Sequence, residues 1–349
     1  LASSSGITND GTLDISGTTS SLGSTITALT GGGEVVLGNR NLNLSNASGS
    51  FGGVISGTGG VAVTGGSQTF SGANTYTGAT TIDSGATLAL TGAGTAGVAS
   101  TLVNNGSFDV SGSAAGASIA TVVGSGNVIL GNQSLTLSNA SGSFDGVISG
   151  TGGLNVTSGV VALGGVSTYT GGTTIGNGAT VRVSSDANLG GAGGVLNLNG
   201  GTLQSTSSFS TSRDINVTGT GTLQANNGTT LSSSGVVSGS GTLVKNGAGA
   251  VILSGDLAHT GGTVVNQGSL QLAGTNSYTG GTTLNGGTLK VASDASLGAG
   301  SSAITFNGGT LQATTSFSSA RDVNATGGGT VATDSGATLS LTGSLVGAG

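Results

Sequence analysis

A short hydrophobic pattern returns at a nearly constant interval through the second half of the chain, and this repetition limits the possible folds more than any other feature. A small residue, then Thr or Ser, then Leu or Val recurs about every 21 residues, with one longer interval between Leu243 and Leu270. A period of roughly 20 to 50 residues is typical of solenoid and other repeat architectures. The hydrophobic positions are Val181, Leu203, Leu223, Leu243, Leu270, Leu289, Leu311 and Val331.

Longer repeats contain this short one. The segment 37–60 returns almost unchanged at 130–153, and the segment 199–219 returns at 307–327. The chain is therefore built from one kind of structural unit used many times.

The repeating unit is predicted to be β-strand. Between Gly-rich turns lie short runs such as "SLQL" and "TLKV", in which Leu270 and Leu272 alternate with polar Gln271. Alternation of period two places the leucines on one face of a strand, whereas the abundant Gly, Ser, Thr and Asn disfavour helix. A unit of about 21 residues with two or three strands fits one coil of a parallel β-helix. Asn at turn starts, as at 177, 199, 285 and 307, would allow amide side chains to stack between coils.

An antiparallel sandwich array is the main alternative. It would show hairpins about every 8 to 12 residues and Pro on edge strands, and this chain of 349 residues has no Pro. The 74 glycines follow no strict Gly-x-y period, so a collagen triple helix is excluded.

Composition excludes several classes of function. There is no Cys, so neither a disulfide framework nor a thiolate metal site is possible. Six basic residues and a net charge of −6 argue against nucleic-acid binding. No apolar run approaches the roughly 18 residues of a membrane-spanning helix. The chain opens at Leu1 without Met or a signal peptide, so we expect a piece of a longer protein.

The segment 238–274, "SGSGTLVKNGAGAVILSGDLAHTGGTVVNQGSLQLAG", closely resembles the autotransporter-associated β-strand repeat, also called the passenger-associated transport repeat. Segments 70–90 and 275–298 resemble the same motif, and the resemblance covers most of 55–92 and 148–349. It implies a passenger of a type V secretion system on the surface of a Gram-negative bacterium, with a translocator barrel expected downstream. Such passengers are typically right-handed parallel β-helices, so residues 1–349 are expected to form one all-β rod of about 17 coils.

One phrase occurs four times: "NTYTGATTI" at 74–82, "STYTGGTTI" at 167–175, "LAHTGGTVV" at 257–265 and "NSYTGGTTL" at 276–284. Its aromatic residues could form a row for stacking on sugars, or each ring could cover the coil below it. Only the last two phrases are about one coil apart, so only they can be immediate neighbours, which favours the structural role. The four positions are Tyr76, Tyr169, His259 and Tyr278.

The charged residues do not suggest catalysis. Arg213-Asp214 and Arg321-Asp322 occupy equivalent places in the two copies of the second long repeat, and adjacent strand residues face opposite sides. Each is expected to be a solvated charge or a partner for a turn carbonyl, while Arg182 and Lys290 are expected to face outward. We predict no catalytic, cofactor-binding or metal-binding residues.

The sequence thus favours a structural or adhesive surface protein that binds copies of itself, or glycans or proteins on other cells. An extracellular fibre subunit that assembles end to end is an alternative, and a carbohydrate-active enzyme is less favoured because the acidic residues are scattered. No nucleic-acid partner and no membrane insertion by these residues are expected.

Overall fold

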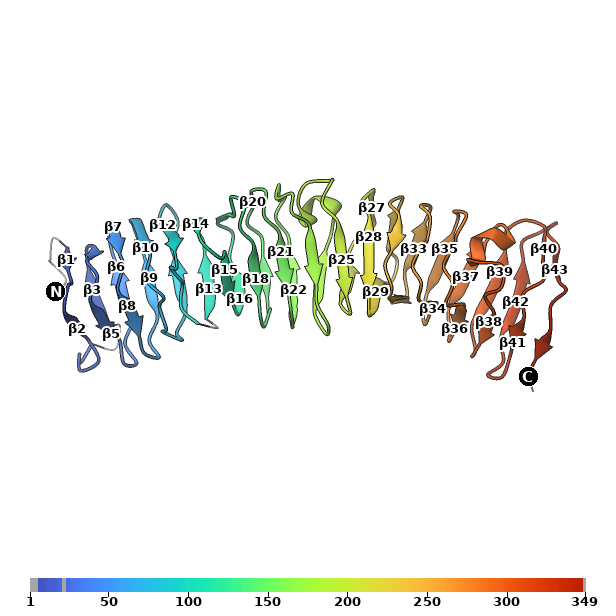
Figure 1. The fold of residues 1–349 in the computed structure, drawn as a ribbon, viewed down its shortest axis with the longest axis horizontal. Coiled ribbons are helices and arrows are strands. Elements are labelled where there is room, and N and C mark those ends of the chain that lie inside the picture. The colour runs from blue at the N-terminus through green and yellow to red at the C-terminus, as the bar shows by residue number, and fades with distance from the viewer. Residues whose placement is uncertain (1–5, 21–22, 99, 348–349) are drawn as a thin grey trace. The chain divides into compact units, whose positions relative to one another are not determined.

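A computed structural model describes residues 6–20, 23–98 and 100–347. The chain divides into two compact units: unit 1 comprises 1–173 with 187–191, and unit 2 comprises 174–186 with 192–349. Within the described parts of both units the strand pairings are parallel, and strands of successive coils lie side by side (Figure 1). The prediction of an all-β, parallel β-solenoid of about 17 turns is confirmed, and the antiparallel alternative is wrong. That residues 1–349 form one rod stays a prediction.

In unit 1, the strands of successive coils stack on three faces of the solenoid. The first face holds β1 (Ile7–Thr8) with β4 (Leu29–Thr30), then β7 (Ala47–Phe51), β10 (Gly66–Phe70), β12 (Thr87–Gly92), β14 (Ser107–Ser113), β17 (Asn127–Ile129) and β20 (Ile148–Ser149). The second holds β3 (Ser24–Ile26), β6 (Leu42–Leu44), β9 (Val61–Val63), β11 (Thr80–Ile82), β13 (Thr101–Asn104) and β16 (Thr121–Val123), with the pair β19 (Ser143–Phe144) and β22 (Val160–Leu163) beyond. The third holds β2 (Thr12–Asp14), β5 (Glu34–Val36) and β8 (Val54–Ser56), then β15 (Ala117–Ile119), β18 (Leu135–Leu137) and β21 (Leu154–Val156).

Unit 2 repeats this arrangement. One set of paired strands is β24 (Thr180–Val183), β26 (Thr202–Ser205), β29 (Thr220–Ala225), β32 (Thr242–Asn246), β34 (Thr263–Val265), β36 (Thr282–Leu284), β38 (Ile304–Phe306), β41 (Val323–Asn324) and β44 (Leu345–Val346). A second is β27 (Phe209–Thr211), β30 (Thr230–Ser233), β33 (Ala250–Leu253), β35 (Ser269–Leu272), β37 (Thr288–Val291), β39 (Thr310–Ala313) and β42 (Thr330–Thr333). The third comprises β25 (Leu196–Asn199), β28 (Ile215–Thr218) and β31 (Val237–Ser238), and the pair β40 (Phe317–Ser319) and β43 (Leu339–Leu341). The short helix η2 (Asp294–Leu297) lies between β37 and β38, while η1 (Asp186–Leu189) and β23 (Thr173–Ile175) include residues of both units.

Apolar side chains fill the interior in columns. Leu270, Leu289 and Leu311 lie over one another in register, each with at most 1% of its surface exposed. Burying one such side chain contributes roughly 1.5–3 kcal/mol. Since each leucine contacts the coils before and after it, a coil is stabilised mainly by its neighbours.

Asparagine amides form a second column at one turn of unit 2, as the Asn-rich turns predict. Asn266 Nδ2 donates to Asn246 Oδ1 at 2.9 Å, Asn285 to Asn266 at 2.8 Å and Asn307 to Asn285 at 2.9 Å. This ladder satisfies polar groups that would otherwise need water, and it holds successive turns in register.

The regular hydrophobic pattern does not form one column, which corrects the simplest interpretation of the sequence. Val181, Leu203 and Leu223 stack in one sheet, whereas Leu270, Leu289, Leu311 and Val331 stack in another. Leu243 pairs with Gly221 and Thr263 rather than with Leu223. The pattern changes face at its longest interval, from Leu243 to Leu270.

The long repeats change face in the same way. Stacked positions lie about 20 apart, as in Ser67–Thr87 and Thr87–Ser107. The copy of the first long repeat at 130 therefore begins about four and two-thirds coils after the copy at 37. The copy of the second long repeat at 307 begins about five and one-third coils after the copy at 199. Accordingly "LNL" at 42–44 lies on the second face of unit 1 and "LTL" at 135–137 on the third. The repeated unit is one arm of a coil, which fits any of the three faces.

Candidate functional site

In each of the four repeated phrases the aromatic side chain points into the interior and is buried. Each tyrosine hydroxyl lies within hydrogen-bond distance of the second threonine after it: 2.7 Å for Tyr76–Thr80, and 2.6 Å for both Tyr169–Thr173 and Tyr278–Thr282. Each of these threonines is the first residue of a strand. All three tyrosines are fully buried. The irregular arm before each strand is thus fixed to the strand by its own ring.

A glycine of the following coil covers each ring. Gly97, Gly190 and Gly298 have φ angles of 82°, 85° and 81°, in the left-handed region that favours glycine. A Cβ on these residues would lie only 2.8–2.9 Å from a ring carbon of Tyr76, Tyr169 and Tyr278, respectively. Sequence reasoning missed these glycines, although each follows its tyrosine by about the length of one coil.

His259 occupies the same kind of corner with a different partner above it. Its ring stacks on Tyr278, with centroids 5.2 Å apart and planes 9° apart, and its Nε2 lies 3.2 Å from Thr263 Oγ1. It is fully buried, and its Nδ1 has no hydrogen-bond partner among the described residues. Burial lowers the pKa of His259 below its usual value.

The corners are not brought together into one site. His259 and Tyr278 touch, as their spacing predicts, while Tyr76 and Tyr169 lie in separate coils of unit 1. Since all four side chains have 0% exposure, no ring offers a face to a sugar in this structure. The geometry supports the structural role and gives no support to a glycan contact.

Acid is expected to destabilise the coil that contains His259. Below pH 6.5 the unfolded chain takes up a proton on this histidine, whereas burial resists protonation in the folded state. The free energy of unfolding therefore falls as the pH falls from 6.5 towards the lowered pKa of the folded protein. Denaturant titrations between pH 7 and 5 would measure this loss, and His259→Tyr should reduce it. An equal loss in both proteins would assign the effect to other groups.

Arg321 is buried, so the expectation that it is a solvated charge is wrong. The residue is 2% exposed, and its guanidinium forms an ion pair with Asp294, with Nε 2.8 Å from Oδ1. It also donates to backbone carbonyls of Asp294, Gly298 and Ser302 at 3.0, 2.7 and 3.1 Å. The alternative expectation, a partner for turn carbonyls, is confirmed. The arginine fastens η2 and the loop after it to the coil.

Arg213 makes the equivalent contacts, and we call each of these buried arginines with its carboxylate and carbonyl partners a clamp. It is 3% exposed, its Nε lies 2.8 Å from Asp186 Oδ1, and its Nη1 donates to the Gly194 carbonyl at 3.1 Å. The adjacent acids face elsewhere, as strand geometry predicts: Asp214 accepts from the Val236 N–H at 2.9 Å and Asp322 from Ser344 at 3.0 Å. Both clamps join an acid to an arginine at the same separation along the chain, and this recurrence could have indicated them from the sequence alone.

Lys245 is a buried cation that sequence reasoning missed. It stacks between Leu223 and Val265 in an apolar column, with 1% exposure. Its Nζ donates to the carbonyls of Asn246, Gly247 and Gln267 at 2.8, 2.8 and 3.1 Å. Burial lowers the pKa of Lys245 to about 8, while the three carbonyls stabilise the ammonium form. The side chain caps a turn from inside the coil.

The described residues contain no group of three or more His, Asp or Glu side chains arranged to hold a metal ion. In the same part of the chain, no helix has both the length and the apolar character needed to cross a membrane. Arg182 is exposed and bonds to Gln204 at 2.9 Å.

Comparison with known proteins matches parts of the chain to one family of repeats. Four segments match the model of the passenger-associated transport repeat: 65–90, 158–183, 243–272 and 268–291. The chain is also 34% identical over 100 residues to a protein described as "Adhesin BmaC autotransporter" from Brucella suis biovar 1 (strain 1330). That match covers 29% of this chain and 2% of the relative's length. No solved structure matches the chain. These four segments of the chain are thus passenger-associated transport repeats.

Proposed function

We propose that the chain is a surface-displayed segment of an adhesin-type autotransporter passenger, and that it acts by binding laterally to copies of itself. The transport repeats and the adhesin-named relative support the general class, and both point away from an enzyme. The proposed location is the bacterial cell surface or the extracellular medium.

The outward face of the solenoid is the observation that carries the proposal. In unit 2 one outward row stacked between the buried columns holds Ser232, Ile252, Gln271, Lys290 and Gln312, and all of these except Ile252 are polar or charged. Only 5% of all residues are charged, so two copies repel each other weakly. Each amide or hydroxyl contributes little, yet a row repeated along many coils can bind through many weak contacts at once.

The proposal predicts concentration-dependent association. Light scattering of the purified chain should show a mass that rises with concentration, and cells that display it should clump. Gln271→Lys with Gln312→Lys, beside Lys290, should weaken association through like-charge repulsion, while Gln271→Asn with Gln312→Asn should not. A chain that stays monomeric at high concentration, on cells that do not clump, would contradict the proposal. Micrographs of end-to-end filaments would favour the fibre alternative instead.

A further inference from the structure

The third face of unit 1 is interrupted, and its strands resume with an open edge. After β8, residues 73–77 and 95–98 pass this face without forming strands, and β15 begins the sheet again. β15 pairs with β18 on one side, and no described strand pairs with it on the other. The interruption lies beside a register shift between β12 and β14, at Ala89 to Thr91.

Ser118 carries the unused backbone groups. The Ala117 N–H donates to Ser134 O at 3.1 Å, and Ile119 O accepts from Ser138 N at 2.9 Å. Neighbouring residues of a parallel strand bond to opposite sides, so the Ser118 N–H and C=O point away from β18. Neither group has a hydrogen-bond partner among the described residues. Regular bonding to the preceding coil returns at Ala120, whose N–H donates to Ser100 O at 3.0 Å.

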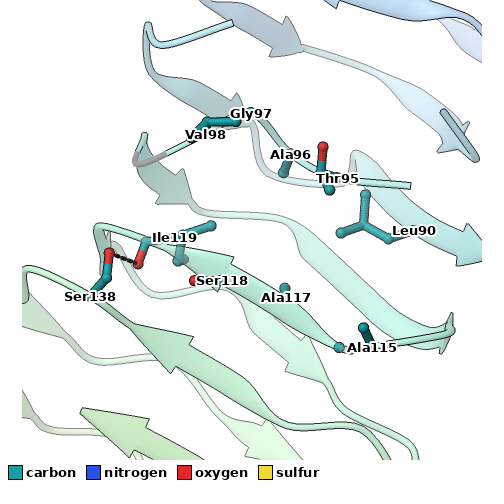
Figure 2. Close-up of a pocket in the computed structure, with 11 residues that line it drawn as sticks. Leu90, Thr95, Ala96, Gly97, Val98, Ala115, Ala117, Ser118, Ile119 and Ser138 are labelled. Carbon is teal, nitrogen blue, oxygen red and sulfur yellow. Dashed lines mark hydrogen bonds between the residues drawn. The ribbon is translucent and has the colours of Figure 1, made fainter. Parts of the chain in front are cut away.

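A cleft of about 410 Å³ lies along this edge. Figure 2 shows Gly97 and Val98 on one side of it, and Ala117, Ser118 and Ile119 of β15 on the other. The cleft opens to solvent at Ser118 and at Val98, which is 53% exposed. Towards the interior it is lined by buried apolar residues, including Leu90, Ala96, Ala117 and Ile119. None of its lining residues is charged.

We propose that β15 accepts an added strand, and that this cleft binds an extended, uncharged peptide with an apolar–polar–apolar pattern. A free N–H and C=O on one residue match the backbone of a parallel strand, and strand addition to an open edge is a recognised mode of peptide binding. The apolar side chains of such a peptide would face Leu90 and Ala96 inside, and its polar side chain would face solvent. This site is separate from the lateral contacts proposed above.

The chain itself provides a probe of this chemistry. The peptide Ser-Leu-Thr-Leu-Ser, the sequence of residues 134–138, already pairs in register with the other edge of β15. Labelled and capped at both ends, it should bind the full chain in a fluorescence polarisation titration. Hydrogen exchange followed by NMR should show a fast Ser118 N–H in the free protein, slower when the peptide is present, beside a protected Ala117 N–H.

Ser118→Pro removes the free donor, while Ser118→Ala keeps it. We expect Ser118→Pro to weaken peptide binding by about tenfold, the effect of losing one backbone hydrogen bond, and Ser118→Ala to bind like the original chain. If the Ala117 N–H of Ser118→Pro is still protected from hydrogen exchange, β15 is still folded in that variant. If that protection is lost, the hydrogen-exchange data on the unaltered chain decide the test. A Ser118 N–H already protected without peptide, no binding to the unaltered chain, or equal binding to Ser118→Pro would each overturn the proposal.

Discussion

Tyr76→Ala is expected to lower the free energy of unfolding by about 3–5 kcal/mol, the usual cost of truncating a large buried aromatic residue. The Tyr76 ring is completely buried and lies beneath Gly97 of the next coil. Because Gly97 has no side chain, it cannot fill the space that the ring leaves. The coil on either side then loses packing as well. Denaturant unfolding followed by circular dichroism would measure the loss.

Tyr76→Phe is the matched control. It keeps the ring and removes only the contact of the hydroxyl with Thr80 Oγ1, so the expected loss is about 1 kcal/mol. Thr80 retains its bond to the Ala96 carbonyl at 2.9 Å. If alanine cost no more than phenylalanine, the ring would not be the element that joins the two coils.

Arg321→Ala is expected to cost about 3–5 kcal/mol, the range for breaking a buried ion pair by removing one partner. The substitution leaves the carbonyls of Gly298 and Ser302 without their donor. The Asp294 side chain is 35% exposed, so water can solvate this carboxylate when its arginine partner is removed. The loss in the free energy of unfolding is therefore expected at the lower end of the range. Hydrogen exchange should become faster from residue 294 to 302, around η2.

Arg182→Ala provides the control for charge alone. Arg182 is exposed, so its removal is expected to change stability by less than about 0.5 kcal/mol. Arg321→Lys keeps the charge but loses the planar guanidinium that reaches Asp294 and several carbonyls together. Its loss of stability should therefore lie between the losses of Arg321→Ala and Arg182→Ala. Similar losses from Arg321→Ala and Arg182→Ala would show that the clamp is not a stabilising contact.

The strands and their parallel stacking could be predicted because each strand carries its own evidence. Leu270 and Leu272 alternate with Gln271, and the same alternation returns at Leu289 and Val291 one coil later. A buried face that recurs once in every coil leaves few folds besides a parallel solenoid. The stacked asparagines could be predicted for the same reason, since their position in the turn recurs with the coil.

The assignment of strands to faces could not be predicted from the sequence. Nothing local distinguishes Leu243 from Leu270, and yet the two lie in different sheets, because every arm of a coil has the same pattern. Buried charges were missed for a related reason. Lys245 looks like an outward residue until its pairing with Leu223 places it in the interior column. Pairing depends on the sum of preceding turn lengths, which no single motif contains.

Coil-on-coil stacking is the central claim, and a disulfide between two engineered cysteines tests it most directly in a chain that has no native Cys. Gln271 and Lys290 are direct neighbours across β35 and β37, within the distance that a disulfide spans. Gln271→Cys with Lys290→Cys should therefore cross-link under mild oxidation. Gln271→Cys with Thr283→Cys, closer in sequence but in a different set of strands, should not. Cross-linking of the second pair alone, or of both at equal rates, would contradict the stacked solenoid.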